Sequence, residues 1–186
     1  MEHRFLKRAF EWVGQDTGED FLEEQEYCPT RDVFQARLES LRARLEQSTF
    51  EQHSLFVAII GEIGNNAFDH NLGSWRDVPG IYFDSDETMV IVADRGQGVR
   101  ATLSRIEPGL KSDVEALEIA FTQKISGRSP EQRGNGLKFV KSVIEKQKWS
   151  LKFFSGIGKA RIDRGNPLRF EQKIEDIKGT VALVYI

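Results

Sequence analysis

The sequence predicts an α+β fold, a two-layer α/β sandwich in which helices cover one face of a mixed, mostly antiparallel sheet. Segments with apolar residues at helical spacing cluster early in the 186-residue chain, and β-rich runs cluster in its last third. The final run, TVALVYI at 180–186, is almost wholly apolar. We therefore place it in the interior of the sheet.

The composition and the absence of certain sequence patterns exclude several classes of protein. The chain is 39% hydrophobic and 30% charged, as ordinary globular domains are, and its net charge of −3 indicates no general attraction to nucleic acid. Cys28 is the single cysteine, which excludes an intramolecular disulfide and a cysteine-based metal site. No apolar run reaches the roughly 18 residues of a membrane span, and no signal peptide is evident, so we expect no membrane partner and a cytoplasmic location.

Residues 1–49 are predicted to form an N-terminal helical extension. A short amphipathic helix at 2–13 precedes a polar connector, and a second helix spans 31–47. Two interpretations of the second helix stay open: it packs on the following domain, or it pairs with a second copy of the chain or another protein. Its apolar side carries Val33, Phe34, Leu38, Leu41 and Leu45.

The second predicted domain spans residues 50–186. A long helix at 50–70 is expected to stop near Gly73, and turn residues separate a strand pair at 80–84 and 88–94. Further helices are predicted at 114–123 and 137–147. Strands are predicted at 149–155, 159–163, 168–174 and 180–186.

Three motifs in this domain carry candidate chemistry. In GEIGNNAFDHN (61–71), the side chains of Glu62, Asn66 and His70 fall on one helix face, beside the apolar stripe. A carboxylate one turn before an amide can position water and bind a hard cation through oxygen. An ordinary solvated flank would show the same pattern.

The second motif, VIVADRGQGV (90–99), runs an apolar strand into Asp94, Gly96 and Gly98. Glycines allow close approach of a ligand to the backbone, and the carboxylate can accept a hydrogen bond from an exocyclic amine such as that of adenine. A capped turn is the alternative interpretation.

The third motif, RGNGLKFVKSVIEK (133–146), opens a helix with Gly134 and Gly136, whose free N–H groups can hold phosphate. A basic segment precedes it and suits a polyphosphate or a mobile lid, although an exposed loop is the plainer alternative. Its cations are Lys124, Arg128 and Arg133, followed by Lys138.

Together these motifs resemble the gyrase, Hsp90, histidine-kinase and MutL (GHKL) superfamily over residues 50–186. Glu62-x-x-x-Asn66-Ala67-x-x-His70 resembles its N box. Asp94-x-Gly96-x-Gly98 resembles the G1 box, Gly134-x-Gly136-Leu137 the G2 box, and Gly179-Thr180 the late Gly-Thr pair.

The resemblance implies a Bergerat ATP-binding fold with ATP and Mg²⁺ as cofactors. Asn66 would coordinate Mg²⁺, Glu62 would act as general base or position water, and Asp94 would bond the adenine amino group with help from Thr180. The glycines and Leu137 would shape the pocket. Lys124, Arg128 and Arg133 would contact the phosphates.

The same resemblance leaves three functions open. His70 matches the form seen in anti-sigma-factor serine kinases, which favours a stand-alone protein kinase acting on a partner protein. An ATPase or ATP-gated switch is the second, and a non-catalytic interaction protein the third. A self-contained sensor kinase is not expected, because neither His3 nor His53 is placed as a phosphoacceptor. The transducer domain of gyrase and MutL relatives is also not expected, whereas a homodimer is compatible with the resemblance.

Overall fold

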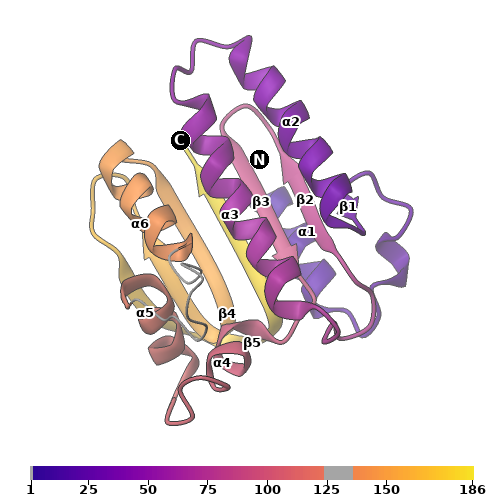
Figure 1. Cartoon of the computed structure of the whole chain (residues 1–186), viewed down its shortest axis with the longest axis vertical. Helices are drawn as coiled ribbons and strands as arrows, with labels where there is room; N and C mark the ends of the chain where they lie inside the picture. Colours follow the sequence, from indigo (N-terminus) through magenta and orange to yellow (C-terminus); the bar gives the residue numbers. More distant parts are fainter. Residues whose placement is uncertain (1, 124–135) are drawn as a thin grey trace.

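A five-stranded antiparallel sheet forms the centre of the protein in a computed structural model that describes residues 2–123 and 136–186 (Figure 1). The strand order is β1-β2-β3-β5-β4, and each described pairing is antiparallel. The interior position predicted for the last strand is confirmed. The bounds are β1 Tyr27–Cys28, β2 Ile81–Ser85, β3 Met89–Asp94, β4 Ser150–Ile162 and β5 Arg169–Tyr185.

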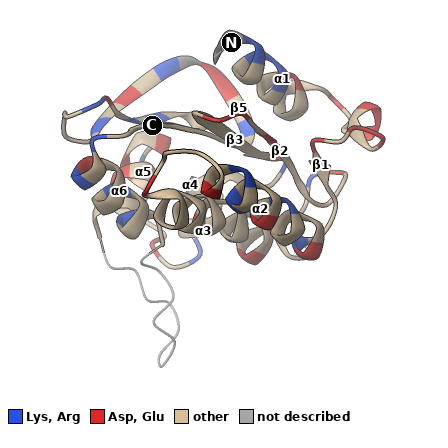
Figure 2. Cartoon of the chain, turned by 90° about the horizontal axis from the view of Figure 1, so that it is seen from above, with Lys and Arg blue, Asp and Glu red and all other residues tan. Residues whose placement is uncertain are grey.

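Helices lie on both faces of this sheet (Figure 2). The larger layer contributes the apolar side chains of α2, α3, α5 and α6 to one core with the sheet. On the other face, α1 packs against β2, β3 and β5 in a smaller aromatic-rich core. The predicted fold class is confirmed, with α1 added on the second face. The helices are α1 Glu2–Gly14, α2 Arg31–Glu46, α3 His53–Asn71, α4 Gly98–Leu103, α5 Asp113–Thr122 and α6 Gly136–Gln147.

The helix α2 packs closely on α3 because α3 has glycine where the two helices meet. A Cβ on Gly64 would lie 2.2 Å from the Phe34 ring, which leaves no room for a larger residue. Leu38, Leu41 and Leu45 continue the buried side of α2. β1 adds to the edge of the sheet beside β2, so residues before position 50 take part in both the sheet and the helical layer.

Two features differ from the expected elements. The runs 149–155 and 159–163 form one strand, β4, and 168–174 and 180–186 belong to one strand, β5. Register shifts on either side of Gly156 break the pairing locally and explain the interrupted sequence pattern. The short elements β1, α4 and the 3₁₀ turn at Glu19–Phe21 were not expected, because two to six residues show no periodicity.

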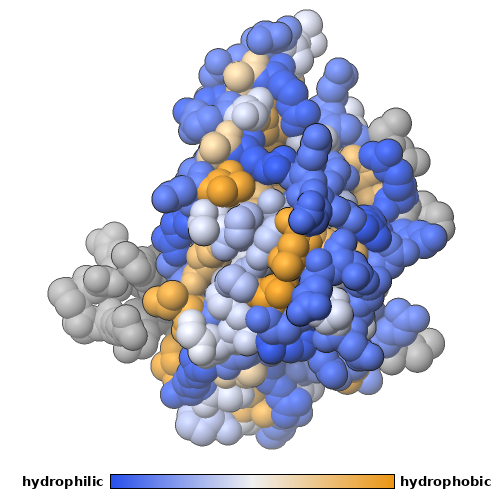
Figure 3. Space-filling model, turned by 90° about the vertical axis from the view of Figure 1, so that its right-hand side faces the viewer, coloured by the Kyte–Doolittle hydropathy of each residue, from blue (hydrophilic) through white to orange (hydrophobic). Residues whose placement is uncertain are grey.

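On the surface seen in Figure 3, hydrophilic residues dominate and apolar groups are scattered among them. Across the described part of the chain, no helix is long and apolar enough to span a bilayer.

Candidate functional site

The helix α3 has a polar face beside its buried apolar side chains, as the spacing of these residues in the sequence predicts. Ile63 and Ala67 are buried against the core, whereas Glu62 and His70 are exposed and Asn66 is half-buried. Asn65 points away from this face, since its Oδ1 accepts a hydrogen bond from Gln35 Nε2 of α2 at 3.1 Å. Of the two consecutive asparagines, only Asn66 is therefore available to the site.

Asp94, the last residue of β3, is 2% exposed and is held by three donors. Its Oδ1 accepts from the Gly96 N–H at 2.8 Å and from Asn71 Nδ2 at 3.1 Å. Its Oδ2 accepts from the hydroxyl of Thr180, which faces Asp94 in the β3–β5 register. The sheet thus places the aspartate and the late threonine side by side.

Burial raises the pKa of Asp94, although the hydrogen bonds from Thr180, Gly96 and Asn71 act in the opposite direction. An ionised carboxylate has about four acceptor positions, and three are used here. Within residues 2–123 and 136–186, no donor takes the remaining position, which is on Oδ2. Burying a carboxylate with unused accepting capacity costs free energy, and a buried group with a shifted pKa beside a pocket is a candidate functional residue.

Asn71 is a site residue that the sequence interpretation missed. It is 4% exposed and joins α3 to the loop after β3, because it donates to Asp94 while its Oδ1 accepts from Gln97 N at 3.1 Å. A Cβ on Gly96 would lie 2.0 Å from Asn71 Oδ1, so the loop needs glycine there. A signal was present: Asn71 lies four residues after Ala67 on the apolar stripe, where a polar residue implies a buried partner.

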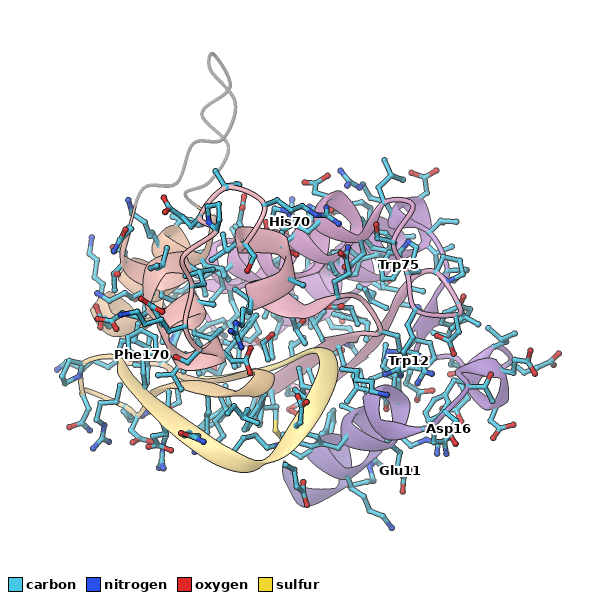
Figure 4. The ribbon with its side chains drawn as sticks, turned by 90° about the horizontal axis from the view of Figure 1, so that it is seen from below. Glu11, Trp12, Asp16, His70, Trp75 and Phe170 are labelled. Carbon is cyan, nitrogen blue, oxygen red and sulfur yellow. The ribbon has the colours of Figure 1, made fainter. Side chains whose placement is uncertain are left out.

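A pocket with about 560 Å³ of empty space, its open mouth included, lies between α3, α4, α6 and the sheet. Most of its wall is apolar, and a few polar groups converge on it, as is common in sites for small ligands. His70 lies at the exposed end of α3 (Figure 4), and desolvation by its neighbours lowers the pKa of its ring. Of the predicted site residues, the pocket is lined by Asn66, His70, Asp94, Gly98, Leu137 and Thr180.

Glu62 and Gly136 meet beside this pocket. A Cβ on Gly136 would lie 2.7 Å from Glu62 Oε2 and 3.3 Å from Asn66 Nδ2, so the amino end of α6 abuts the polar face of α3. The first N–H groups of a helix have no partner within it and favour anions. Gly96 instead lines a second cavity, to which Gln97 and Gly98 of the same loop also contribute.

The remaining predicted residues, Lys124, Arg128, Arg133 and Gly134, lie outside the described residues, as does the expected lid. Within 2–123 and 136–186, no three His, Cys, Asp or Glu side chains gather as a metal site. A magnesium ion at Asn66 would therefore take most of its oxygen ligands from water and from a bound molecule, as Mg²⁺ sites with substrate phosphates do.

Comparison with known proteins finds no matching family model and no matching curated protein. Among solved structures, the chain is similar to the ATPase region of Saccharomyces cerevisiae topoisomerase II, at 17% identity over 70% of this chain, with a TM-score of 0.41. It is also similar to the N-terminal domain of a DNA repair protein, at 15% identity over 69% of this chain, with a TM-score of 0.32. The matches span 37% and 34% of those two chains.

Proposed function

We propose that this chain binds Mg-ATP and acts as a regulatory protein kinase that transfers the γ-phosphate to a partner protein. The observation that carries the proposal is the buried Asp94 carboxylate, which has one open acceptor position in an otherwise apolar pocket. That arrangement fits a flat, largely apolar base with an exocyclic amine. The order of the three glycine- and asparagine-bearing motifs supports the same ligand.

Each part of the pocket matches one part of the nucleotide. Asp94 would accept from the amine of the base, with Thr180 fixing the carboxylate, while Ile63 and Leu137 offer apolar surface to the ring. Asn66 would hold the cation. The amino end of α6 at Gly136 would face the phosphates.

When bound, Mg-ATP supplies an activated phosphoryl group whose charge the cation neutralises. The protein would hold the base, place the phosphates at the polar face of α3, and take up the proton of the attacking hydroxyl. Glu62 is the carboxylate beside that face, next to Gly136 and Asn66, and we assign it the general-base role toward the hydroxyl of the partner.

One observation favours a second candidate, an ATPase or ATP-gated switch. Glu62 is exposed, so water reaches it as readily as a protein hydroxyl does. The two reactions share every described residue of the site and differ only in the acceptor.

The fate of the γ-phosphate separates them. The protein is incubated with ATP that is radioactive at the γ-position and with a protein fraction from its own cells. The label should then appear on a second protein. Glu62→Gln should reduce transfer by about 100-fold or more, as loss of a general base does, with nucleotide affinity nearly unchanged. Glu118→Gln, an exposed glutamate on α5, is the matched control.

Label found only as free phosphate would replace the kinase with the ATPase. An intact protein that does not bind Mg-ATP by calorimetry would refute the proposed function as a whole. Asn66→Ala tests the metal role: nucleotide affinity should lose its dependence on magnesium, and a variant that keeps this dependence would contradict the assignment.

A further inference from the structure

The loop after β3 is anchored on the face opposite to the pocket by Arg95, the residue next to Asp94. Side chains alternate along a strand, so consecutive residues point to opposite faces. Asp94 faces the helical layer, and Arg95 faces α1, where its side chain is completely buried. Figure 4 shows Trp12 of α1 and His70 of α3 on opposite sides of the sheet.

Arg95 collects the carbonyl groups at the end of α1. Its Nη2 donates to Gln15 O at 3.0 Å and to Asp16 O at 3.2 Å, and its Nη1 donates to Trp12 O. The guanidinium also lies 5.4 Å from the ring of Trp12. A cation at the carboxyl end of a helix is favourable, because the carbonyls there carry partial negative charge.

Asp77 fixes the guanidinium in this position. Its Oδ1 accepts from Arg95 Nε at 2.8 Å and its Oδ2 from Arg95 Nη2 at 2.6 Å, a two-point contact that sets orientation as well as distance. Oδ2 also accepts from Gly18 N at 2.7 Å, so the segment after α1 is included.

The peptide group between Arg95 and Gly96 connects this anchor to the site. Its carbonyl accepts from Arg76 N at 3.1 Å, and its N–H donates to Asp94 Oδ1 at 2.8 Å. Arg76 in turn donates from Nη2 to Val13 O at 2.8 Å. Any rotation of this peptide group moves a donor of the Asp94 carboxylate.

We propose that Arg95, held by Asp77 against the end of α1, is a positioning residue that orients the Asp94 carboxylate for the nucleotide base. The inference rests on the proposed ATP site. It makes nucleotide affinity depend on the contact between Arg95 and the end of α1, a helix that lies on the other face of the sheet.

The test compares two carboxylates that anchor α1 at different places. Asp77→Asn weakens the Arg95 contact beside the site. Glu24→Gln weakens the ion pair with Arg8, which lies one turn of α1 before Trp12. The two carboxylate side chains are similarly exposed, 23% and 25%, but Arg95 is 0% exposed and Arg8 is 37% exposed, so Asp77→Asn should cost more stability and the two variants are compared by their nucleotide affinities.

Calorimetry with an unhydrolysable ATP analogue should show affinity about tenfold lower in Asp77→Asn, as the loss of an oriented charged hydrogen bond predicts, and unchanged in Glu24→Gln. Asp77→Glu, which keeps the charge, should restore part of the affinity. A merely structural role would lower the melting temperature of both variants and leave both affinities unchanged.

Side-chain amide resonances of Asn71 give a readout without nucleotide, because Nδ2 donates to Asp94. They should shift in Asp77→Asn and stay in place in Glu24→Gln. A wild-type protein that does not bind the analogue would refute the proposed function but leave this readout. Unshifted Asn71 resonances in Asp77→Asn would overturn the positioning role.

Discussion

Two buried ionisable side chains, Asp94 and Arg95, lie next to each other at the end of β3, and they differ in their hydrogen-bond partners. The Arg95 guanidinium has hydrogen bonds from all three of its nitrogens, to one carboxylate and three carbonyls. Among the described residues, the Asp94 carboxylate has three uncharged donors, and one of its about four acceptor positions has no donor. Every nitrogen of the Arg95 guanidinium therefore has an acceptor within the chain, whereas the described residues leave one acceptor position of Asp94 without a donor.

We interpret this difference as one between Arg95, which holds the structure together, and Asp94, which we propose binds a ligand. Burying either group is costly, and the cost is offset only by its partners. For Arg95 those partners belong to the chain. For Asp94 we propose that a ligand completes the set, so we expect changes at Arg95 to appear mainly in stability, with a smaller effect on affinity through Asp94, and changes at Asp94 to appear in binding.

The largest effect should come from Arg95→Met, which keeps the volume of the side chain and removes its charge. Asp77 and the carbonyls of α1 then lose their donor, and unfolding free energy should fall by about 3–5 kcal/mol, as when one partner of a buried pair is removed. Urea unfolding followed by circular dichroism measures this. A loss no greater than that of Arg164→Met, an exposed arginine, would contradict the comparison.

Asp94→Asn should show the opposite profile. The amide oxygen can still accept from Gly96 and Asn71, and the amide nitrogen can donate to the Thr180 hydroxyl, so stability should change by less than about 1 kcal/mol. The open acceptor position is lost, and ATP affinity should fall about thirtyfold, equivalent to about 2 kcal/mol. Calorimetry beside Asp20→Asn, an exposed control, tests this. Unchanged affinity would remove Asp94 from the site.

The smallest effect is a pH dependence with opposite signs on the two faces. Burial opposes ionisation of Asp77, but the hydrogen bonds from Arg95, Val78 and Gly18 prevail and lower its pKa from 3.8 to about 2. Its contribution to stability is therefore present above pH 3.8 and is lost as the pH falls through about 2.

For Asp94 the sign reverses. Its pKa is raised above 3.8, so its contribution is fully present below that pH and is lost as the pH rises through the higher folded-state value. In a series of urea unfolding curves, Asp77→Asn should lose stability less steeply than wild type on acidification. Asp94→Asn should lose less than wild type as the pH rises from 3.8. Identical slopes in all three proteins would contradict both assignments.

The sequence predicted the surroundings of Asp94 far better than those of Arg95. Helical spacing placed Glu62, Asn66 and His70 on one face of α3, and the apolar run before Asp94 placed that residue at a strand end. Both inferences need only local periodicity. The interior position of β5 also followed from its apolar composition.

Arg95 could not be predicted in the same way. An arginine after a strand and before a glycine is normally solvated, and its partners Trp12 and Asp77 lie 83 and 18 residues away in the chain. The second face of the sheet was missed for a related reason: the amphipathic pattern of residues 2–13 shows that α1 is buried on one side but not where. Contacts of such separation follow from tertiary structure.

The position of β5 has a consequence for biosynthesis. This strand lies between β3 and β4 in the sheet but comes after both in the chain. While the ribosome is still making residues 150–162, the hydrogen-bonding edge of β3 has no neighbour on that side, and unpaired edges invite association between chains. Thr180, which completes the shell of Asp94, arrives with β5. Until residues 169–185 have been made, a nascent chain therefore lacks both the strand that joins β3 to β4 and the threonine that donates to Asp94.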